Sequence, residues 1–318
     1  MRDLFPQTNA FRIISADKKS GNLSHAYLLN VEDGDLIGSY LKSAAKLILC
    51  KNADGYCNAC RDCKLIDANM HADVNFYPKD KKLSVADADD LVAQSVIRPL
   101  EADKRVFVVE RLETLNQNQN KLLKTLEEPP KNVVLLIGAE KSSAILPTIK
   151  SRAKKIDIPL FSTDELLELT KEDFPSEKLA KISALLAGGK VGLMEKRYRD
   201  ESTIRLFEGV VDFLARARSA RDLPEHISVL SEFEATLLIA TLKIALNEMM
   251  RIKCGYKSFI DDFRLVDAAE NFPQGALVSI IERLGELEKA VYFNGNQVML
   301  KDSVVFAVLE EKAKWLKL

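Results

Sequence analysis

Apolar positions in the first 160 residues follow two periodicities in turn. Short apolar runs bounded by polar residues predict buried strands, and they lie at 25–29, 74–77, 106–109, 133–137 and, more briefly, 155–158. Between them, apolar residues recur about every 3.6 positions, which predicts helices, at 39–49, 84–97 and 112–126. Because strands and helices alternate, we expect an α/β fold with a parallel sheet and helices on both of its faces.

The strand pattern ends near Phe161. Ser162 and Glu165 have the spacing of a capping box, which predicts the start of a helix. Long amphipathic stretches then predict helices at 201–219, 231–252, 274–293 and 301–316. We therefore expect three domains, an α/β domain at 1–161, a small helical domain at 162–200 and a larger helical domain at 201–318.

Composition and charge restrict the class of protein. The 318 residues are 47% hydrophobic, and 46 basic residues balance 47 acidic ones to a net charge of −1. No apolar run approaches the ~20 residues of a membrane helix, and the first residues lack the apolar core of a signal peptide. A soluble, cytoplasmic protein is expected. The near-zero charge argues against a domain that coats nucleic-acid phosphates on its own.

Four of the five cysteines form one cluster, at Cys50, Cys57, Cys60 and Cys63. Two-residue spacers let neighbouring thiolates converge on one Zn²⁺ ion, and four sulfurs close the site, so a bound zinc would be structural. The alternative is a set of buried thiols that pack as small hydrophobic side chains. Polar neighbours such as Arg61 and Asp62 make this segment a poor core, which favours zinc. His71 is a weaker fifth candidate ligand, and Cys254 is expected in a helix core.

The segment after the first strand lies where an α/β nucleotide-binding protein carries its phosphate loop. Such a loop needs glycines, a lysine for the phosphate charge and a Ser or Thr for Mg²⁺. Only Gly34 keeps a glycine role here, whereas Ile37 stands at the lysine position and Gly38 at the Ser/Thr position. The loop is therefore a degenerate phosphate loop, and productive ATP binding is not expected.

The strand at 106–109 indicates the same loss. A strand that serves ATP hydrolysis ends in an Asp for Mg²⁺ and a Glu that activates water. Here it ends in Glu110 and Arg111, so a cation replaces the base. The segment at 138–140 also lacks the Thr or Asn of a nucleotide sensor. Several independent losses favour an inactive ATPase site.

Several motifs together resemble a known family. They are Ser24-His-Ala-Tyr-Leu28, the cysteine cluster, His71-Ala-Asp-Val74, Asn120-Lys-Leu-Leu-Lys-Thr-Leu-Glu-Glu-Pro-Pro130, Thr148-Ile-Lys-Ser151-Arg152 and Asn294-Gly-Asn296. In this order they resemble the delta-prime family of bacterial DNA polymerase III clamp-loader subunits, within the AAA+ proteins. The gamma/tau ATPase paralogues share the cysteines and the Leu-Leu-Lys-Thr-Leu-Glu-Glu-Pro-Pro string but resemble the pattern with an intact phosphate loop. The losses at Ile37, Gly38 and Arg111 therefore select delta-prime.

The resemblance implies a RecA-like AAA+ domain with an inserted zinc module, a helical lid and a helical collar. It implies a stator without catalysis of its own, which binds no ATP productively. Arg152, with Ser151, would be an arginine finger that acts in trans on the ATP site of a neighbouring gamma/tau subunit. The implied partners are gamma/tau and delta in a hetero-pentamer, which loads the beta sliding clamp onto primed DNA.

Other interpretations stay open at this stage. Arg152 is also compatible with an ordinary surface arginine in a purely architectural ring subunit. An active AAA+ ATPase with a nonstandard phosphate loop is a second alternative, against which Ile37 and Gly38 argue. A zinc-module protein that binds DNA alone is a third, and the net charge argues against it. Nothing in the chain resembles a polymerase active site.

Overall fold

The computed structural model describes residues 3–52, 54–216, 230–292 and 297–316. The chain divides into two compact units, residues 1–160 and 161–318, and each is described by itself. The boundary falls where the strand pattern of the sequence ends. The further division of the second half at about residue 200 stays a prediction.

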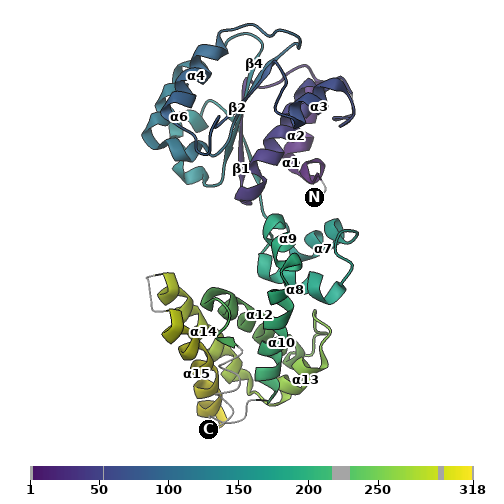
Figure 1. Cartoon of the computed structure of the whole chain (residues 1–318), viewed down its shortest axis with the longest axis vertical. Helices are drawn as coiled ribbons and strands as arrows, with labels where there is room; N and C mark the ends of the chain where they lie inside the picture. The colour runs from purple at the N-terminus through teal and green to yellow at the C-terminus, as the bar shows by residue number, and fades with distance from the viewer. Residues whose placement is uncertain (1–2, 53, 217–229, 293–296, 317–318) are drawn as a thin grey trace. The chain divides into compact units, whose positions relative to one another are not determined.

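The first unit alternates strands and helices (Figure 1). Its strands are β1 (Ala26–Val31), β2 (Val74–Tyr77), β3 (Arg105–Val109), β4 (Val133–Ala139) and β5 (Lys154–Ile158). Its α-helices are α1 (Asn9–Lys19), α2 (Ile37–Leu49), α3 (Arg61–Asp67), α4 (Val85–Ser95), α5 (Leu123–Glu127) and α6 (Pro147–Lys150). Short 3-10 helices are η1 (Phe5–Gln7), η2 (Gly34–Leu36), η3 (Leu112–Leu122) and η4 (Ser142–Ala144).

The five strands form one sheet in the order β2-β3-β4-β1-β5, and every neighbouring pair is parallel. Helices α1, α2 and α3 lie on one face, and α4 and α6 lie on the other (Figure 1). Strand β4 is buried along its whole length, as a central strand covered on both faces must be. The predicted α/β class and parallel sheet are confirmed. Parallel pairing also brings the carboxyl ends of all five strands to one edge, where such folds bind ligands.

The predicted single helix at 112–126 is wrong in its first two thirds. Residues 112–122 form the 3-10 helix η3, which is interrupted at Asn116, where φ is 49°. Asparagine tolerates this left-handed conformation better than most residues do, and such a residue breaks a regular helix. Only α5, at Leu123–Glu127, is α-helical, and it ends just before Pro129 and Pro130. The apolar face was recognised correctly, because Leu112, Leu122 and Leu126 are buried.

The second unit contains helices and no strand among the residues that the structure describes. They are α7 (Thr163–Thr170), α8 (Glu177–Ala187), α9 (Val191–Arg199), α10 (Glu201–Arg216), α12 (Ala235–Lys253), α13 (Phe263–Glu270), α14 (Gln274–Tyr292) and α15 (Gln297–Leu316). The predicted capping box is present, because Ser162 Oγ accepts from Glu165 N and Glu165 Oε2 accepts from Ser162 N.

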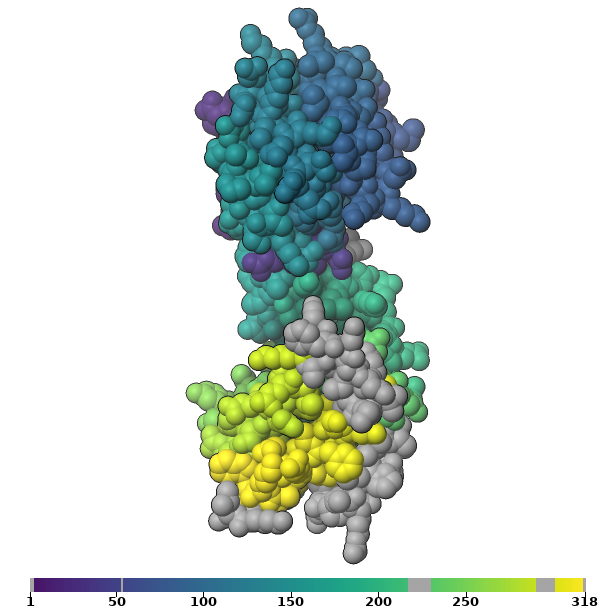
Figure 2. All heavy atoms as spheres, turned by 90° about the vertical axis from the view of Figure 1, so that its left-hand side faces the viewer, coloured from purple at the N-terminus to yellow at the C-terminus, as the bar shows by residue number. Residues whose placement is uncertain are grey.

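One apolar core is shared by α10, α12, α13, α14 and α15. Helices α14 and α15 pack along each other and are seen side by side in Figure 2. Residues 217–219 and 293 of the predicted helices, and the Asn294-Gly-Asn296 motif, lie outside the described residues. Within the described part of the chain, no helix combines the length and apolar character of a membrane span.

Candidate functional site

The degenerate phosphate loop lies at the carboxyl edge of the sheet and is filled by side chains of the chain itself. Arg111 follows β3, and its Nη2 donates to the Gly34 carbonyl at 3.0 Å. Its Nη1 lies 2.9 Å from Oε2 of Glu140, which follows β4. A Cβ at Gly34 would lie 2.6 Å from Glu140 Oε2, so the carboxylate touches the loop backbone. An ion pair thus lies against the loop that would have to cradle phosphates.

The two lost loop residues have structural roles. Ile37 is 1% exposed, and a Cβ at Gly138 of β4 would come within 2.4 Å of its Cγ2. The side chain at the lysine position therefore points into the core and contacts the sheet. Gly38 lies against Glu110, whose Oε1 would be 2.7 Å from an added Cβ. Burial raises the pKa of Glu110, while Lys42 and Arg111 oppose the shift. Neither position offers the charge or hydroxyl that a nucleotide site needs.

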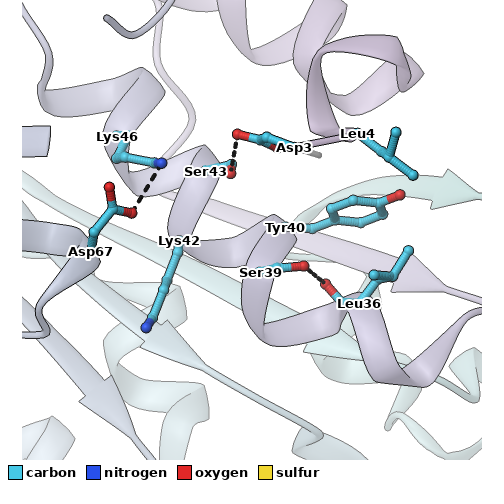
Figure 3. A pocket seen from close by; sticks show the side chains of 9 residues that line it. All are labelled: Asp3, Leu4, Leu36, Ser39, Tyr40, Lys42, Ser43, Lys46 and Asp67. Atoms are coloured by element: carbon cyan, nitrogen blue, oxygen red, sulfur yellow. Dashed lines mark hydrogen bonds and ion pairs between the residues drawn. The ribbon is translucent and has the colours of Figure 1, made fainter. Parts of the chain in front are cut away.

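A cavity of about 220 Å³ lies beside α2 (Figure 3). Its lining is Asp3, Leu4, Leu36, Ser39, Tyr40, Lys42, Ser43, Lys46 and Asp67. Several of its polar groups contact one another: Lys46 Nζ lies 3.0 Å from Asp67 Oδ1, and Ser43 Oγ donates to Asp3 Oδ2 at 3.1 Å. Leu4, Leu36 and the Tyr40 ring complete the wall, so the cavity has no set of converging phosphate donors.

The four cysteines converge at the ends of two helices. Cys50 follows α2, Cys60 is the N-cap of α3 and Cys63 lies in its first turn. All four Sγ atoms lie within 4.8 Å of one another, with Cys50 Sγ 3.8 Å from Cys57 Sγ and 3.9 Å from Cys60 Sγ. A tetrahedral ion with Zn–S bonds of ~2.3 Å places its sulfurs ~3.8 Å apart. The donor set and its spacing therefore fit a Zn²⁺ ion.

The surroundings of the cysteines also suit thiolate ligands. Backbone N–H groups of Ala59 and Cys60 lower the pKa of Cys57 to about 6, whereas burial raises the pKa of Cys63 to about 12. Cys60 N donates to Cys57 Sγ at 3.2 Å, and Cys63 N donates to Cys60 Sγ at 3.4 Å. The ammonium of Lys18, on α1, donates to the Cys50 carbonyl. These groups would offset the charge of four thiolates around one ion.

His71 lies outside this cluster, as the weaker prediction for it implied. Its Nδ1 accepts from Asp73 N at 3.1 Å, and its Nε2 lies 3.6 Å from Asp62 Oδ1, so both nitrogens face other partners. It packs the zinc module against the start of β2 instead of binding metal. The expectation for Cys254 is wrong, because this residue follows the last turn of α12 and is exposed. Periodicity could not distinguish the last core position from the first residue beyond the helix.

Arg152 lies at the other edge of the sheet. It stands between α6 and β5, and β5 begins in register with β1, where Lys154 pairs with Tyr27. The degenerate loop begins only after Val31, so at ~3.3 Å per residue the two sites are about 16 Å apart along the sheet. Arg152 Nη1 donates to the Thr148 carbonyl at 2.9 Å and to Ser151 Oγ at 3.3 Å. Its side chain is 35% exposed, and Nη2 pairs with Glu127 Oε1 at 2.9 Å.

Two of these ion pairs could not be inferred from the sequence. Arg111 and Glu140 are 29 residues apart, and Arg152 and Glu127 are 25 apart. Only the parallel sheet brings each pair to the same edge. The signal that was available was the placement of all four residues at strand or helix ends.

Comparisons with known proteins agree on one family. Residues 6–162 match the family described as "DNA polymerase III, delta subunit". The chain is 32% identical over 213 residues to DNA polymerase III subunit delta′ of Pseudomonas aeruginosa, covering 64% of this chain and 65% of that protein. It is 26% identical over 218 residues to the delta′ subunit of Bacillus subtilis, covering 65% of each.

Other matches are more distant. A gamma/tau subunit of Mycoplasma genitalium is 27% identical over 238 residues, which cover 67% of this chain and 40% of that protein. The aligned part of the chain thus spans less than two thirds of the length of these relatives. Among solved structures, a gamma subunit-related protein of Thermotoga maritima covers 98% of this chain and 100% of its own, with 16% identity and a TM-score of 0.44.

Proposed function

The chain belongs to the family of DNA polymerase III delta and delta′ subunits, and on that premise we propose that it is the stator of a clamp loader. In this proposal it hydrolyses no ATP itself. It supplies Arg152 to the ATP site of a neighbouring gamma/tau subunit. Its four cysteines hold a structural zinc ion.

The position of Arg152 carries the proposal. The guanidinium lies at the amino edge of the sheet, about 16 Å from the loop of its own domain along the strands, and is 35% exposed. If Arg152 contacts a nucleotide, that nucleotide belongs to another subunit. A guanidinium stabilises the charge that develops on a transferring phosphoryl group, which is worth about 10³–10⁵ in rate. Loss of loader ATPase on Arg152→Ala tests this role.

The absence of intrinsic hydrolysis rests on the carboxyl edge of the sheet. The Arg111–Glu140 pair lies against Gly34, and Ile37 is buried where a lysine would be needed. The carboxylate of Glu140 would repel a phosphate at this place. These contacts favour a nucleotide-free stator over an active ATPase with an unusual loop.

The isolated chain is accordingly expected not to bind Mg-ATP with a Kd below about 1 mM. At 1 mM Mg-ATP the free energy of unfolding should then rise by less than about 0.5 kcal/mol. Thermal unfolding with and without nucleotide measures this, with a gamma/tau subunit as the positive control. A stabilisation near 2.7 kcal/mol, which corresponds to ligand at about 100 times its Kd, would instead show a working nucleotide site.

Partners follow from the same premise. The stator is proposed to join gamma/tau and delta subunits in a hetero-pentamer, through a collar at 201–318 and beside a lid at 162–200. ATP binding by the motor subunits would select the ring shape that contacts Arg152, which couples nucleotide to assembly. The loader would then open the beta sliding clamp and place it around primed DNA.

A further inference from the structure

The carboxylate of Glu127 is the ion-pair partner of Arg152. Glu127 Oε1 lies 2.9 Å from Arg152 Nη2, while Nη1 donates to the Thr148 carbonyl and to Ser151 Oγ. These contacts use three of the five guanidinium N–H groups. Within the described residues, two N–H groups, on Nε and Nη2, remain for a phosphate oxygen. The plane of the guanidinium is thereby set by two carbonyl-type acceptors on one side.

Glu127 is itself held in place by the fold. It is the last residue of α5, whose Thr125 and Leu126 are buried, and Pro129 prevents the helix from continuing. On the other side, Gln119 fixes the segment that leads into α6. Its fully buried amide donates to the Ala144 carbonyl at 2.9 Å and accepts from Leu146 N at 3.1 Å. Both partners of the pair therefore stand on packed elements.

From this geometry we propose that Glu127 is a positioning residue for Arg152. This inference rests on the proposed trans role of Arg152 and extends it. A free arginine side chain must be ordered each time it contacts a phosphate, and that ordering opposes catalysis. The carboxylate holds the guanidinium in one orientation before the neighbouring nucleotide arrives. Both side chains are partly exposed, at 35% for Arg152 and 49% for Glu127, so the pair itself adds little to stability.

The test is the clamp- and DNA-stimulated ATPase of the reconstituted loader with Glu127→Ala. We expect kcat to fall by about 10- to 100-fold, because misplacing a catalytic group by about 1 Å costs up to ~10² in rate. KM for ATP should stay unchanged, since the ordering acts in the transition state. Glu128→Ala is the matched control, because Glu128 is the neighbouring exposed carboxylate on the same turn. Its kcat should change less than about twofold.

A double-mutant cycle separates positioning from a structural effect. If Glu127 acts through Arg152, Glu127→Ala should cause no further loss in an Arg152→Ala loader. An equal loss in both backgrounds, or an unchanged kcat for Glu127→Ala, overturns the proposal. If Arg152→Ala lowers ATPase and Glu127→Ala does not, only the positioning role fails. If Arg152→Ala itself is without effect in an intact ring, the trans role fails and the positioning role fails with it.

Discussion

Replacing Arg152 by alanine is expected to lower the stimulated ATPase of the reconstituted loader by about 10³-fold or more at saturating ATP. The guanidinium would no longer meet the charge that develops on the phosphoryl group of the neighbouring site. Because the side chain is partly exposed and lies in a short turn after α6, its loss should leave the fold intact. Steady-state phosphate release, with clamp and primed DNA present, measures the effect.

The control for this variant is Lys155→Ala. Lys155 is also partly exposed and pairs with Asp157 at 3.0 Å, three residues further along the chain. It should leave the rate within about twofold, as surface substitutions generally do. Gel filtration must show that both variants assemble. An intact ring that contains Arg152→Ala and retains full activity would make the chain an architectural subunit only.

Loss of the metal is the second large effect that we expect. Cys60→Ser removes a ligand whose Sγ also accepts from Cys63 N at the start of α3. The variant should lose the roughly one zinc per chain of the wild type and about 5 kcal/mol of stability in the first unit. That is a fraction of the ~10–16 kcal/mol that zinc supplies to isolated finger peptides, because the surrounding sheet folds partly without the module.

Metal analysis and urea unfolding measure the two quantities separately. Cys254→Ser is the matched control, since this exposed cysteine lies in the second unit, and it should change neither. A wild-type chain that is free of zinc and equally stable after treatment with a chelator would refute the structural zinc site.

The sequence predicted features that depend on neighbouring residues. Apolar runs located the strands, since a buried parallel strand is continuously hydrophobic. The cysteine cluster was located because its ligands lie close together along the chain. The interruption at Asn116 was not predicted, because an apolar periodicity does not report a single left-handed residue. Helix α1 was also missed, although its Lys18 reaches the cysteine loop.

Contacts between distant segments were beyond the sequence. The mismatches at Ile37 and Gly38 predicted a loss of function at the phosphate loop, but not what fills the space. The Arg111–Glu140 contact depends on the parallel order of β3, β4 and β1. In the same way, the motif containing Glu127 and the motif containing Arg152 were both recognised, but their contact is visible only in the fold.

The most direct test of the central claim is a structure of the assembled loader with ADP and beryllium fluoride in its ATP sites. The account predicts that Arg152 lies at hydrogen-bond distance, about 3 Å, from the fluoride in the adjoining gamma/tau site, with no nucleotide at Gly34 of this chain. A filled adjoining site with Arg152 still turned away and remote from the fluoride, or nucleotide bound at Gly34, would contradict it.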